Sequence, residues 1–393
     1  MKQEYKERIE RLQNHLKEMQ VDAMLVSSQD ALFYLSGASY MPLERPFFIV
    51  VNQNGAVDIV VPELEKEHMS KVQGFGEIKS YFEYPSKEGD NWYDKLCELT
   101  GPDVVMGIEP SLPIGNMNKI RAKEIKVIDF IDVMRLVKDA EEIEAIRLAA
   151  KYTDDGMKKI HTGLYRGESV LEVSMPAKDI QTAVIKETPY DYYNSSFLTA
   201  GWPAPKSAQP HSLPDLNSRM GDGPIVLMSF NRVNGYAAEC ERTVFLGDPT
   251  ERELELYNHM MKAREIAFSM VRPGVRCADI DAATQAYFAQ YGLDKYILHR
   301  TGHGIGMGNH EAPWLSVGSD HVLEENMVIS VEPGIYLPDV GGFRHSDTVL
   351  VTKDGYELIT KYPFDLESLI VRKKNVKASI KGKIVRKAVN FPE

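Results

Sequence analysis

The apolar residues of this 393-residue chain fall into many short runs separated by turns and polar segments. In the first third, runs such as Ala23–Val26, Phe47–Val51, Val57–Val61 and Val104–Ile108 are rich in β-branched residues and alternate with helical stretches. That rhythm is typical of a layer of strands covered by helices. We therefore predict an α/β domain over residues 1–134.

The pattern changes near residue 135. Asp139 can cap a helix that carries Glu142 at the capping-box position, and further helices are predicted at about 250–271 and 277–291. The remaining apolar runs, with Asn-Gly and Gly-Gly turns between them, are typical of helices packed on a largely antiparallel sheet. We predict an α+β domain over residues 135–365 and a basic tail over 366–393, so the fold class is mixed α/β (α+β).

Composition excludes several classes of function. Lys and Arg number 46 against 57 Asp and Glu, and the net charge of −11 disfavours a nucleic-acid partner. The apolar runs are far shorter than the roughly 20 residues that cross a membrane, and the first residues lack the apolar core of a signal peptide. Three widely spaced cysteines, Cys97, Cys240 and Cys277, favour reduced thiols and a cytoplasmic location.

Histidines cluster in the second half. Four of the ten lie in polar segments rich in glycine, proline and carboxylates: His211, His303, His310 and His345. Such segments are typical of a catalytic site on loops and strand ends, and the glycines around His303 allow close approach of the backbone. A phosphate-binding loop is the alternative, which we disfavour because no Lys-Ser/Thr pair follows.

Carboxylates alternate along one predicted strand, where Glu239 and Glu241 point to the same face. Two such neighbours need a cation, which could be a metal ion, a protonated histidine, or a ligand amine or guanidinium. The alternative is a solvent-facing edge strand with Arg242 as the counter-charge. Glu332, just before a Pro-Gly turn, is a third acid whose placement the sequence leaves open.

Read together and in order, these segments resemble the pita-bread (M24) family, which contains methionine and Xaa-Pro aminopeptidases, prolidase and creatinase. The resemblance implies a creatinase-like amino-terminal domain, a pita-bread catalytic domain and a homodimer. The motifs that carry it are Ala208-Gln-Pro-His211, Asn234-Gly-Tyr, Glu241-Arg-Thr, Gly302-His-Gly-Ile-Gly, His310-Glu-Ala-Pro, Val331-Glu-Pro-Gly-Ile-Tyr and Phe343-Arg.

The peptidases of this family bind two divalent metals through two Asp, one His and two Glu. By the resemblance His303 and Glu332 match this set, and Glu239 stands for the second Asp. Ser229 and Ser346 fall where the first Asp and the last Glu are expected. Serines cannot supply the bridging carboxylates of a two-metal clamp, so the usual two-metal centre is disfavoured.

The altered set is similar in character to creatinase and to ectoine hydrolase. That resemblance implies that Glu241 and Glu332 hold a planar cation by charge-assisted hydrogen bonds while His211 moves protons. The main prediction is therefore a metal-independent hydrolase of a non-peptide C–N bond, an amidine or amide, in a small zwitterionic molecule. Its catalytic residues would be His211, Glu241 and Glu332, and no cofactor is favoured.

Two alternatives stay open. The first is an Xaa-Pro dipeptidase or aminopeptidase that uses a single Mn, Fe or Zn ion, held by Glu239, Glu241, His303 and Glu332. The second is a catalytically inactive pita-bread protein that serves as a binding module. Metal content and chelator sensitivity separate the first alternative from the main prediction, and a substrate panel with no turnover would favour the second.

The remaining expectations concern substrate contacts. The resemblance places His303 and His310 beside the substrate, whose carboxylate would need a cation from Arg45 of the partner in a dimer or from Arg344. His345 could replace the missing Glu only if its strand slipped by one residue, which we do not expect. The predicted partners are a small molecule or dipeptide and a second copy of the chain, with no nucleic acid and no membrane.

Overall fold

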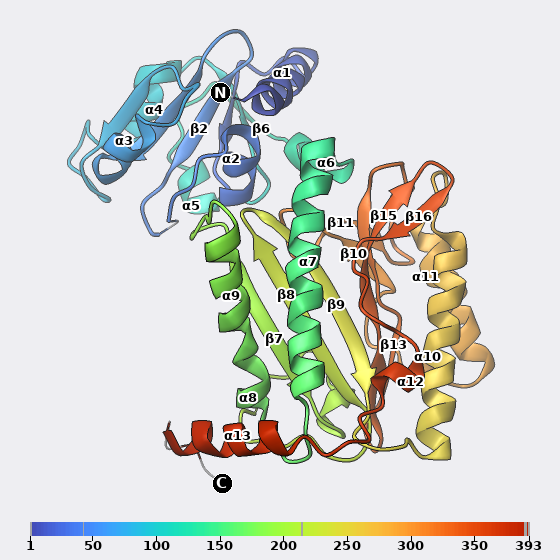
Figure 1. Ribbon diagram of the computed structural model, residues 1–393. Helices are drawn as coiled ribbons and strands as arrows, with labels where there is room; N and C mark the ends of the chain where they lie inside the picture. Colours follow the sequence, from blue (N-terminus) through green and yellow to red (C-terminus); the bar gives the residue numbers. More distant parts are fainter. Residues whose placement is uncertain (1, 42, 214, 389–390, 392–393) are drawn as a thin grey trace. The chain divides into compact units, whose positions relative to one another are not determined.

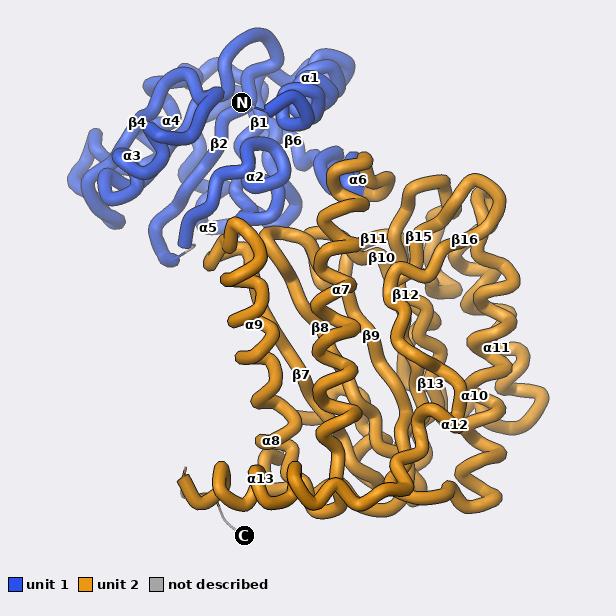
Figure 2. Tube along the Cα trace, in the orientation of Figure 1, with its two compact units in different colours: residues 1–135 blue, residues 136–393 orange. Residues whose placement is uncertain are grey.

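The computed structural model describes residues 2–41, 43–213, 215–388 and 391. The chain divides into two compact units, Met1–Arg135 and Leu136–Glu393 (Figure 2). The division falls at the end of helix α6 (Phe130–Leu136). Residues 389, 390, 392 and 393 of the predicted basic tail lie outside the described residues.

Unit 1 is the predicted α/β layer, and its fold class is confirmed. A six-stranded mixed sheet has the order β4-β3-β2-β1-β5-β6, in which β1 is antiparallel to β2 and parallel to β5. Trp92 packs its ring on Phe48 in the core, with ring centroids 4.9 Å apart. The elements are α1 (Gln3–Glu18), β1 (Ala23–Val26), α2 (Gln29–Ser36), β2 (Phe48–Asn52), β3 (Val57–Pro62), α3 (Glu63–Met69), β4 (Ile78–Tyr81), α4 (Trp92–Thr100), β5 (Val105–Ile108), α5 (Ile114–Met117) and β6 (Glu124–Val127).

Unit 2 is built on an eight-stranded antiparallel sheet of order β11-β10-β12-β15-β9-β8-β7, with β16 paired to β15. A separate hairpin is formed by β13 (Gly334–Leu337) and β14 (Gly341–Arg344). The sheet strands are β7 (Ser196–Trp202), β8 (Ile225–Val233), β9 (Tyr236–Val244), β10 (Gly302–Gly304), β11 (Glu311–Leu315), β12 (Val328–Val331), β15 (Ser346–Thr352) and β16 (Gly355–Leu358).

Helices cover one face of this sheet (Figure 1). The long helix α7 (Ala140–Gly163) begins at the predicted capping box of Asp139 and Glu142 and packs on β8 and β9. A Cβ added at Gly156 would lie 2.3 Å from the Oγ atom of Ser229, so glycine lets α7 approach the sheet closely. The other main helices of this unit are α8 (Val170–Ser174), α9 (Pro176–Glu187), α10 (Glu251–Met270) and α11 (Cys277–Gln290).

A buried ion cluster joins the sheet to α10 on the helix-covered face. Asp347 accepts hydrogen bonds from Arg242 at 2.7 Å and from Arg264 at 2.5 Å. Arg242 therefore points away from Glu239 and Glu241, and the alternative in which it serves as their counter-charge on an exposed strand is wrong. The opposite face of the sheet, free of these helices, carries the polar side chains of the candidate site.

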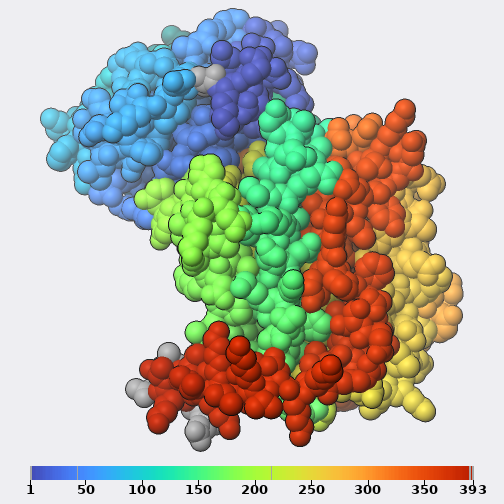
Figure 3. Space-filling view, in the orientation of Figure 1, coloured from blue at the N-terminus to red at the C-terminus, as the bar shows by residue number. Residues whose placement is uncertain are grey.

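The C-terminal segment forms α12 (Leu366–Leu369) and α13 (Val376–Ala388), and α13 lies along one end of unit 2 (Figure 3). Arg386 contacts Glu172 and donates to the hydroxyl group of Tyr165 at 3.1 Å. In the part of the chain that the structure describes, no helix is long and apolar enough to span a membrane. Cys97, Cys240 and Cys277 are all free thiols.

Candidate functional site

The centre of the helix-free face is strand β9. Glu239 and Glu241 share this face, because side chains two residues apart on a strand point the same way, and both are buried. Their direct partners on β8 are Phe230 and Met228. Ser229, which the resemblance placed at a ligand position, pairs with Cys240 and points to α7 on the other face. The expectation for Ser229 is therefore wrong: apolar side chains occupy β8 where it faces the site.

Strand β15 supplies the other neighbour of these carboxylates. Ser346 pairs with Glu241 across the sheet and donates its hydroxyl proton to Oε1 of Glu239 at 2.6 Å. This register agrees with the expectation that the strand does not slip. His345 accordingly points to the helices and packs edge-on against Tyr257 of α10, with ring centroids 5.5 Å apart.

His303 lies on the short strand β10, which pairs with β11 on one side and β12 on the other. A Cβ added at Gly302 would lie 2.1 Å from the carbonyl oxygen of Ser330, and one at Gly304 would lie 2.1 Å from that of Ala312. The glycines beside His303 thus allow the neighbouring strands to approach closely, because a larger side chain would clash with their backbone. Nδ1 of His303 lies 2.9 Å from the carbonyl oxygen of Gly304 and must donate to it, which leaves Nε2 as the ring nitrogen that can bind a further proton or a metal ion.

That Nε2 atom is buried, has no hydrogen-bond partner among the described residues, and faces two carboxylates. It lies 3.4 Å from Oε1 of Glu332 and 3.7 Å from Oε1 of Glu239. Glu332 directly follows β12, and its backbone N–H donates to the carbonyl oxygen of Thr301 at 2.7 Å. Asp281 of α11 holds Thr301 in turn through hydrogen bonds of 2.9 and 2.8 Å, so the strand end that carries Glu332 is fixed from behind.

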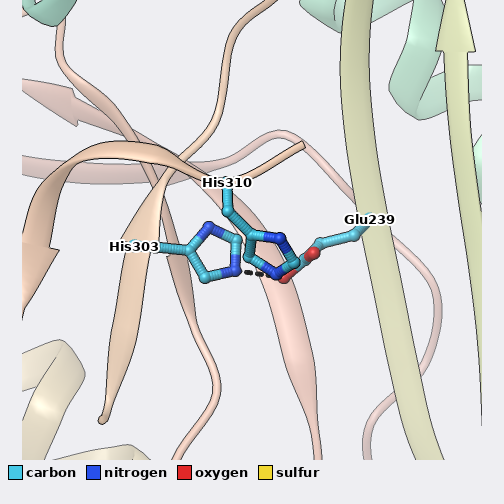
Figure 4. A group of neighbouring side chains, drawn as sticks. All are labelled: Glu239, His303 and His310. Atoms are coloured by element: carbon cyan, nitrogen blue, oxygen red, sulfur yellow. Dashed lines mark ion pairs between the residues drawn. The ribbon is translucent and has the colours of Figure 1, made fainter. Parts of the chain in front are cut away.

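His310 completes the group. Its ring lies 4.1 Å from that of His303, centroid to centroid, and Glu239, His303 and His310 each offer a ligand atom within 4.8 Å of the others (Figure 4). The turn before β11 is fixed by Glu311, which accepts from the backbone of Gly308 at 2.9 Å and from Lys138 at 3.0 Å. Imidazole and carboxylate donors converging in this way are typical ligands of Mn, Fe or Zn ions.

The charges of these groups depend strongly on one another. Burial disfavours the charged form of His303, but Glu239 and Glu332 outweigh it and raise its pKa to about 9. Burial also opposes ionisation of Glu332, but His303 and His299 hold the pKa of that carboxyl well below its ordinary range. Burial and the positive charge of His303 lower the pKa of His310 to about 4. The group therefore favours a cation at Nε2 of His303, either a proton or a metal ion.

Glu241 takes part in a different interaction from the one expected. Arg344 donates through Nη2 to Oε1 of Glu241 at 2.7 Å, and its Nε contacts Oε2. Burial disfavours the charged guanidinium, but Glu241 raises the pKa of Arg344. Within the structure, neither the Glu241 carboxylate nor the Arg344 guanidinium is free for a substrate, and the expected metal set loses Glu241 to this ion pair.

Sequence reasoning missed two residues that support Arg344. The hydroxyl group of Tyr336 lies 3.2 Å from Nη1 of Arg344 and 2.6 Å from Nε2 of His299. Both residues flank motifs that the sequence singled out, since His299 lies four residues before His303 and Tyr336 four residues after Glu332. Tyr336 lies on β13, which the Pro-Gly turn separates from β12, so strand alternation does not connect it to Glu332 and no local pattern in the sequence indicates its place.

Among the described residues, neither His211 nor Arg45 makes a hydrogen bond or an ion pair with this group. His211 is exposed in a turn; burial is the main cause that lowers the pKa of His310 and of His299, and His211 makes a small further contribution to both. Arg45, in unit 1, donates to Glu83 at 2.8 Å and to Glu44 at 2.6 Å. Arg300, which sequence reasoning missed, stacks on Trp314 at 4.5 Å from the ring centroid and also lowers the pKa of His310.

Comparisons with known proteins agree with this architecture. Residues 8–143 match the Creatinase/Prolidase N-terminal domain, and residues 144–353 match Metallopeptidase family M24. The chain is 29% identical to an Xaa-Pro dipeptidase of Pyrococcus horikoshii over 90% of its length and 97% of the relative. It is 30% identical to an Xaa-Pro dipeptidase of Pyrococcus furiosus, over 91% of this chain and 98% of that one.

Solved structures of prolidases have the same fold as this chain over nearly its whole length. The prolidase from Pyrococcus horikoshii superimposes with a TM-score of 0.77 at 29% identity, covering 92% of this chain and 99% of the relative. The prolidase from Thermococcus sibiricus gives 0.82 at 26% identity over 94% and 100%. These relatives favour the Xaa-Pro peptidase alternative over the creatinase-like main prediction, and peptidases of this family use divalent metals. The chain belongs to metallopeptidase family M24 and is a hydrolase of C–N bonds.

Proposed function

We propose that this chain hydrolyses small Xaa-Pro dipeptides with the help of one divalent metal ion. The observation that carries the proposal is the buried Nε2 atom of His303, which has no hydrogen-bond partner among the described residues and faces Glu332 and Glu239, so that the group needs a cation there. Its Nδ1 donates to a backbone carbonyl, the usual arrangement of a metal-binding histidine. The names of the relatives supply the substrate class.

The residues that would hold the ion are Glu239, His303 and His310, with Glu332 beside them. They replace the predicted set, because Glu241 is paired with Arg344 and His310 joins instead. A bound divalent ion of this kind polarises a carbonyl group and lowers the pKa of water near it. Ser346 fixes the orientation of Glu239 through its hydrogen bond to Oε1.

Two further residues have roles in the proposal. The guanidinium of Arg300 is held by its stack on Trp314, and the structure shows no acidic partner for it among the described residues. Arg300 is therefore available to bind the carboxylate of a dipeptide. It replaces Arg45 and Arg344 in this role, because glutamates neutralise the charges of those two arginines. His211, at the exposed turn, would protonate the nitrogen of the leaving group.

The amidine prediction has less support. An amidinium substrate needs the carboxylate of Glu241, and the chain's own guanidinium already contacts both oxygens of that carboxylate. Displacing the guanidinium of Arg344 from Glu241 would leave a buried positive charge without its partner, and an unpaired buried charge destabilises the folded protein. The same ion pair removes Glu241 from the catalytic residues of the peptidase proposal.

The proposal is tested with purified protein on a panel of Xaa-Pro dipeptides, the same dipeptides with an amidated carboxyl terminus, and small amidines. We expect turnover of the free dipeptides, weak turnover of the amidated ones, loss of activity on chelation, and recovery with Mn²⁺. Chelator-resistant cleavage of an amidine would return the function to the creatinase-like prediction. No turnover of any substrate, with or without Mn²⁺, would favour the binding-protein alternative. A homodimer and a cytoplasmic location remain predictions.

A further inference from the structure

The segment that contains α13 has a strong local positive charge. Residues 372–388 include eight Lys and Arg side chains and no Asp or Glu, although the whole chain has a net charge of −11. The two arginines of the segment are paired with carboxylates, whereas none of its six lysines forms an ion pair with a described residue. The lysines are Lys373, Lys374, Lys377, Lys381, Lys383 and Lys387. Their charges are therefore not neutralised locally.

One face of α13 is fixed to unit 2. Gly382 and Arg386, one helical turn apart, are the buried residues of this helix. A Cβ added at Gly382 would clash with the carboxylate of Glu172 on α8 and with the hydroxyl group of Tyr165. Arg386 contacts the same carboxylate and the same hydroxyl group. These contacts set the rotation of the helix about its axis, so its other face is turned to solvent (Figure 3).

The outward face of α13 carries a row of aliphatic side chains. Val376, Ile380 and Ile384 are four residues apart and therefore lie one above the other along the helix. They are 62%, 56% and 64% exposed. Gly382, two residues after Ile380, lies on roughly the opposite side, because an α-helix turns by about 100° per residue. The row thus has no partner within the described chain.

Lysines border this row on both sides. The same rotation places Lys377 and Lys381 along one edge of the row and Lys383 along the other, and all three are exposed. An apolar stripe bordered by lysines is the pattern of a helix that lies in the surface of an anionic membrane. The stripe enters the boundary of the acyl chains, and the long lysine side chains reach the headgroups.

A hollow beside the helix combines the same two kinds of group. It has a volume of about 600 Å³, and its lining includes Val376 and Ile380 of the row together with Lys373, Lys374 and Lys383. Ammonium groups bind a phosphate through charge-assisted hydrogen bonds, and the aliphatic side chains match the apolar part of a lipid. The hollow therefore suits the headgroup of an anionic phospholipid.

We propose that the outward face of α13 binds the surface of an anionic lipid bilayer. This inference does not depend on the proposed peptidase function. A second copy of the chain would bring the same positive charge to the face, and a nucleic acid would leave the aliphatic row uncovered, so a lipid surface fits both features best. The sequence-based expectation of no membrane partner rests on the lack of spanning segments, and a helix that lies on the surface needs none.

The experiment measures binding of the full-length protein to vesicles by flotation. The vesicles contain phosphatidylcholine alone or phosphatidylcholine with phosphatidylglycerol. We expect binding to the anionic vesicles, binding at least about 10-fold weaker to the neutral ones, and weaker binding as the salt concentration rises. Binding that is equal for the two kinds of vesicle, or no binding to either, would overturn the proposal.

Variants assign the binding to α13. The triple variant Lys377→Gln, Lys381→Gln and Lys383→Gln should bind anionic vesicles at least about 10-fold more weakly, since each lysine near such a surface contributes about 5-fold. Ile380→Ser with Ile384→Ser keeps every charge and should also lose at least about 10-fold, because the row no longer enters the bilayer. The matched control is Ile185→Ser with Lys186→Gln at exposed positions on α9, which should bind like the wild type.

Other outcomes would assign the face to a different partner. Vesicle binding that is unchanged in the double serine variant would mean that charge alone acts, and this overturns the proposal. Self-association of the wild type without vesicle binding, lost in the double serine variant, would give the row to a second copy and overturn it as well. Circular dichroism of each variant checks that it is folded.

Discussion

Nε2 of His303 lies 3.4 Å from Oε1 of Glu332, and no described residue gives that nitrogen a hydrogen bond. The strand end that carries Glu332 is fixed by the bond from its backbone to Thr301, and the ring of His303 is fixed by the carbonyl oxygen of Gly304. Both side chains are thus held in an arrangement that needs a cation between or beside them.

The first prediction concerns Glu332→Gln. The amide keeps the shape of the side chain but removes the negative charge, and we expect the affinity for Mn²⁺ to fall by at least about 10-fold, since even outer contacts of metal sites have effects of that size. Calorimetric titration of metal-free protein measures it. Glu325→Gln is the control, because Glu325 is exposed on the loop before β12. Equal affinities in Glu332→Gln and the wild type would remove Glu332 from the metal site.

The second prediction is that His211→Ala lowers kcat while leaving KM nearly unchanged. His211 is exposed, so its replacement is expected to leave the fold intact, and it is among the groups that contribute to the lowered pKa of His310 and of His299. Loss of a positioned proton donor typically costs about 10²- to 10⁴-fold in rate. Steady-state kinetics on the best Xaa-Pro dipeptide measures both constants. A normal kcat in His211→Ala would contradict the proposed role of His211 in proton transfer. His259→Ala, on α10, serves as the control.

Much of the fold follows from local patterns in the sequence. The β-branched runs before residue 135 and the capping box at Asp139 and Glu142 act over a few residues, so they predict strands and the start of α7 without knowledge of the rest. The pairing of strands far apart in the sequence, such as β10 with β12, depends on packing across the whole unit, and no local pattern predicts it.

The candidate site was also predictable only where local patterns in the sequence determine it. Alternation correctly put Glu239 and Glu241 on one face, because that rule is local. The partner of each acid was not predictable, since Ser346 and Arg344 arrive from strands about a hundred residues away. The error over Ser229 has this origin too: counting residues between motifs does not show which face of β8 each side chain occupies.

The third prediction tests the buried ion cluster behind the site. Asp347→Asn leaves the guanidiniums of Arg242 and Arg264 without their shared negative charge, and we expect a loss of about 3–5 kcal/mol in the free energy of unfolding. Urea unfolding measures it. The matched control is Asp248→Asn, which breaks the exposed pair with Arg372 and should cost under about 1 kcal/mol. Similar losses in the two variants would mean that burial of the cluster contributes little.

The fourth prediction concerns Glu168, a buried carboxyl near Glu172 whose role is structural. Burial, with the negative charge of Glu172, raises the pKa of Glu168 from 4.5 to about 8 in the folded protein. Between those two values the folded state keeps a proton that the unfolded state has released, so stability falls as pH rises through the window, by an amount on the order of a few kcal/mol.

Glu168→Gln has no proton to lose and keeps an amide oxygen where the carboxyl oxygen accepts the backbone N–H of Tyr165 at 3.3 Å. We therefore expect the variant to be more stable than the wild type at about pH 8 and to lose less stability between about pH 5 and about pH 8. Thermal unfolding at several pH values measures both effects. Glu265→Gln, at an exposed position on α10, should follow the wild-type profile. If Glu168→Gln follows it too, Glu168 is ionised in the folded protein and its burial is offset by a partner such as Arg386, whose charge lowers the pKa of Glu168.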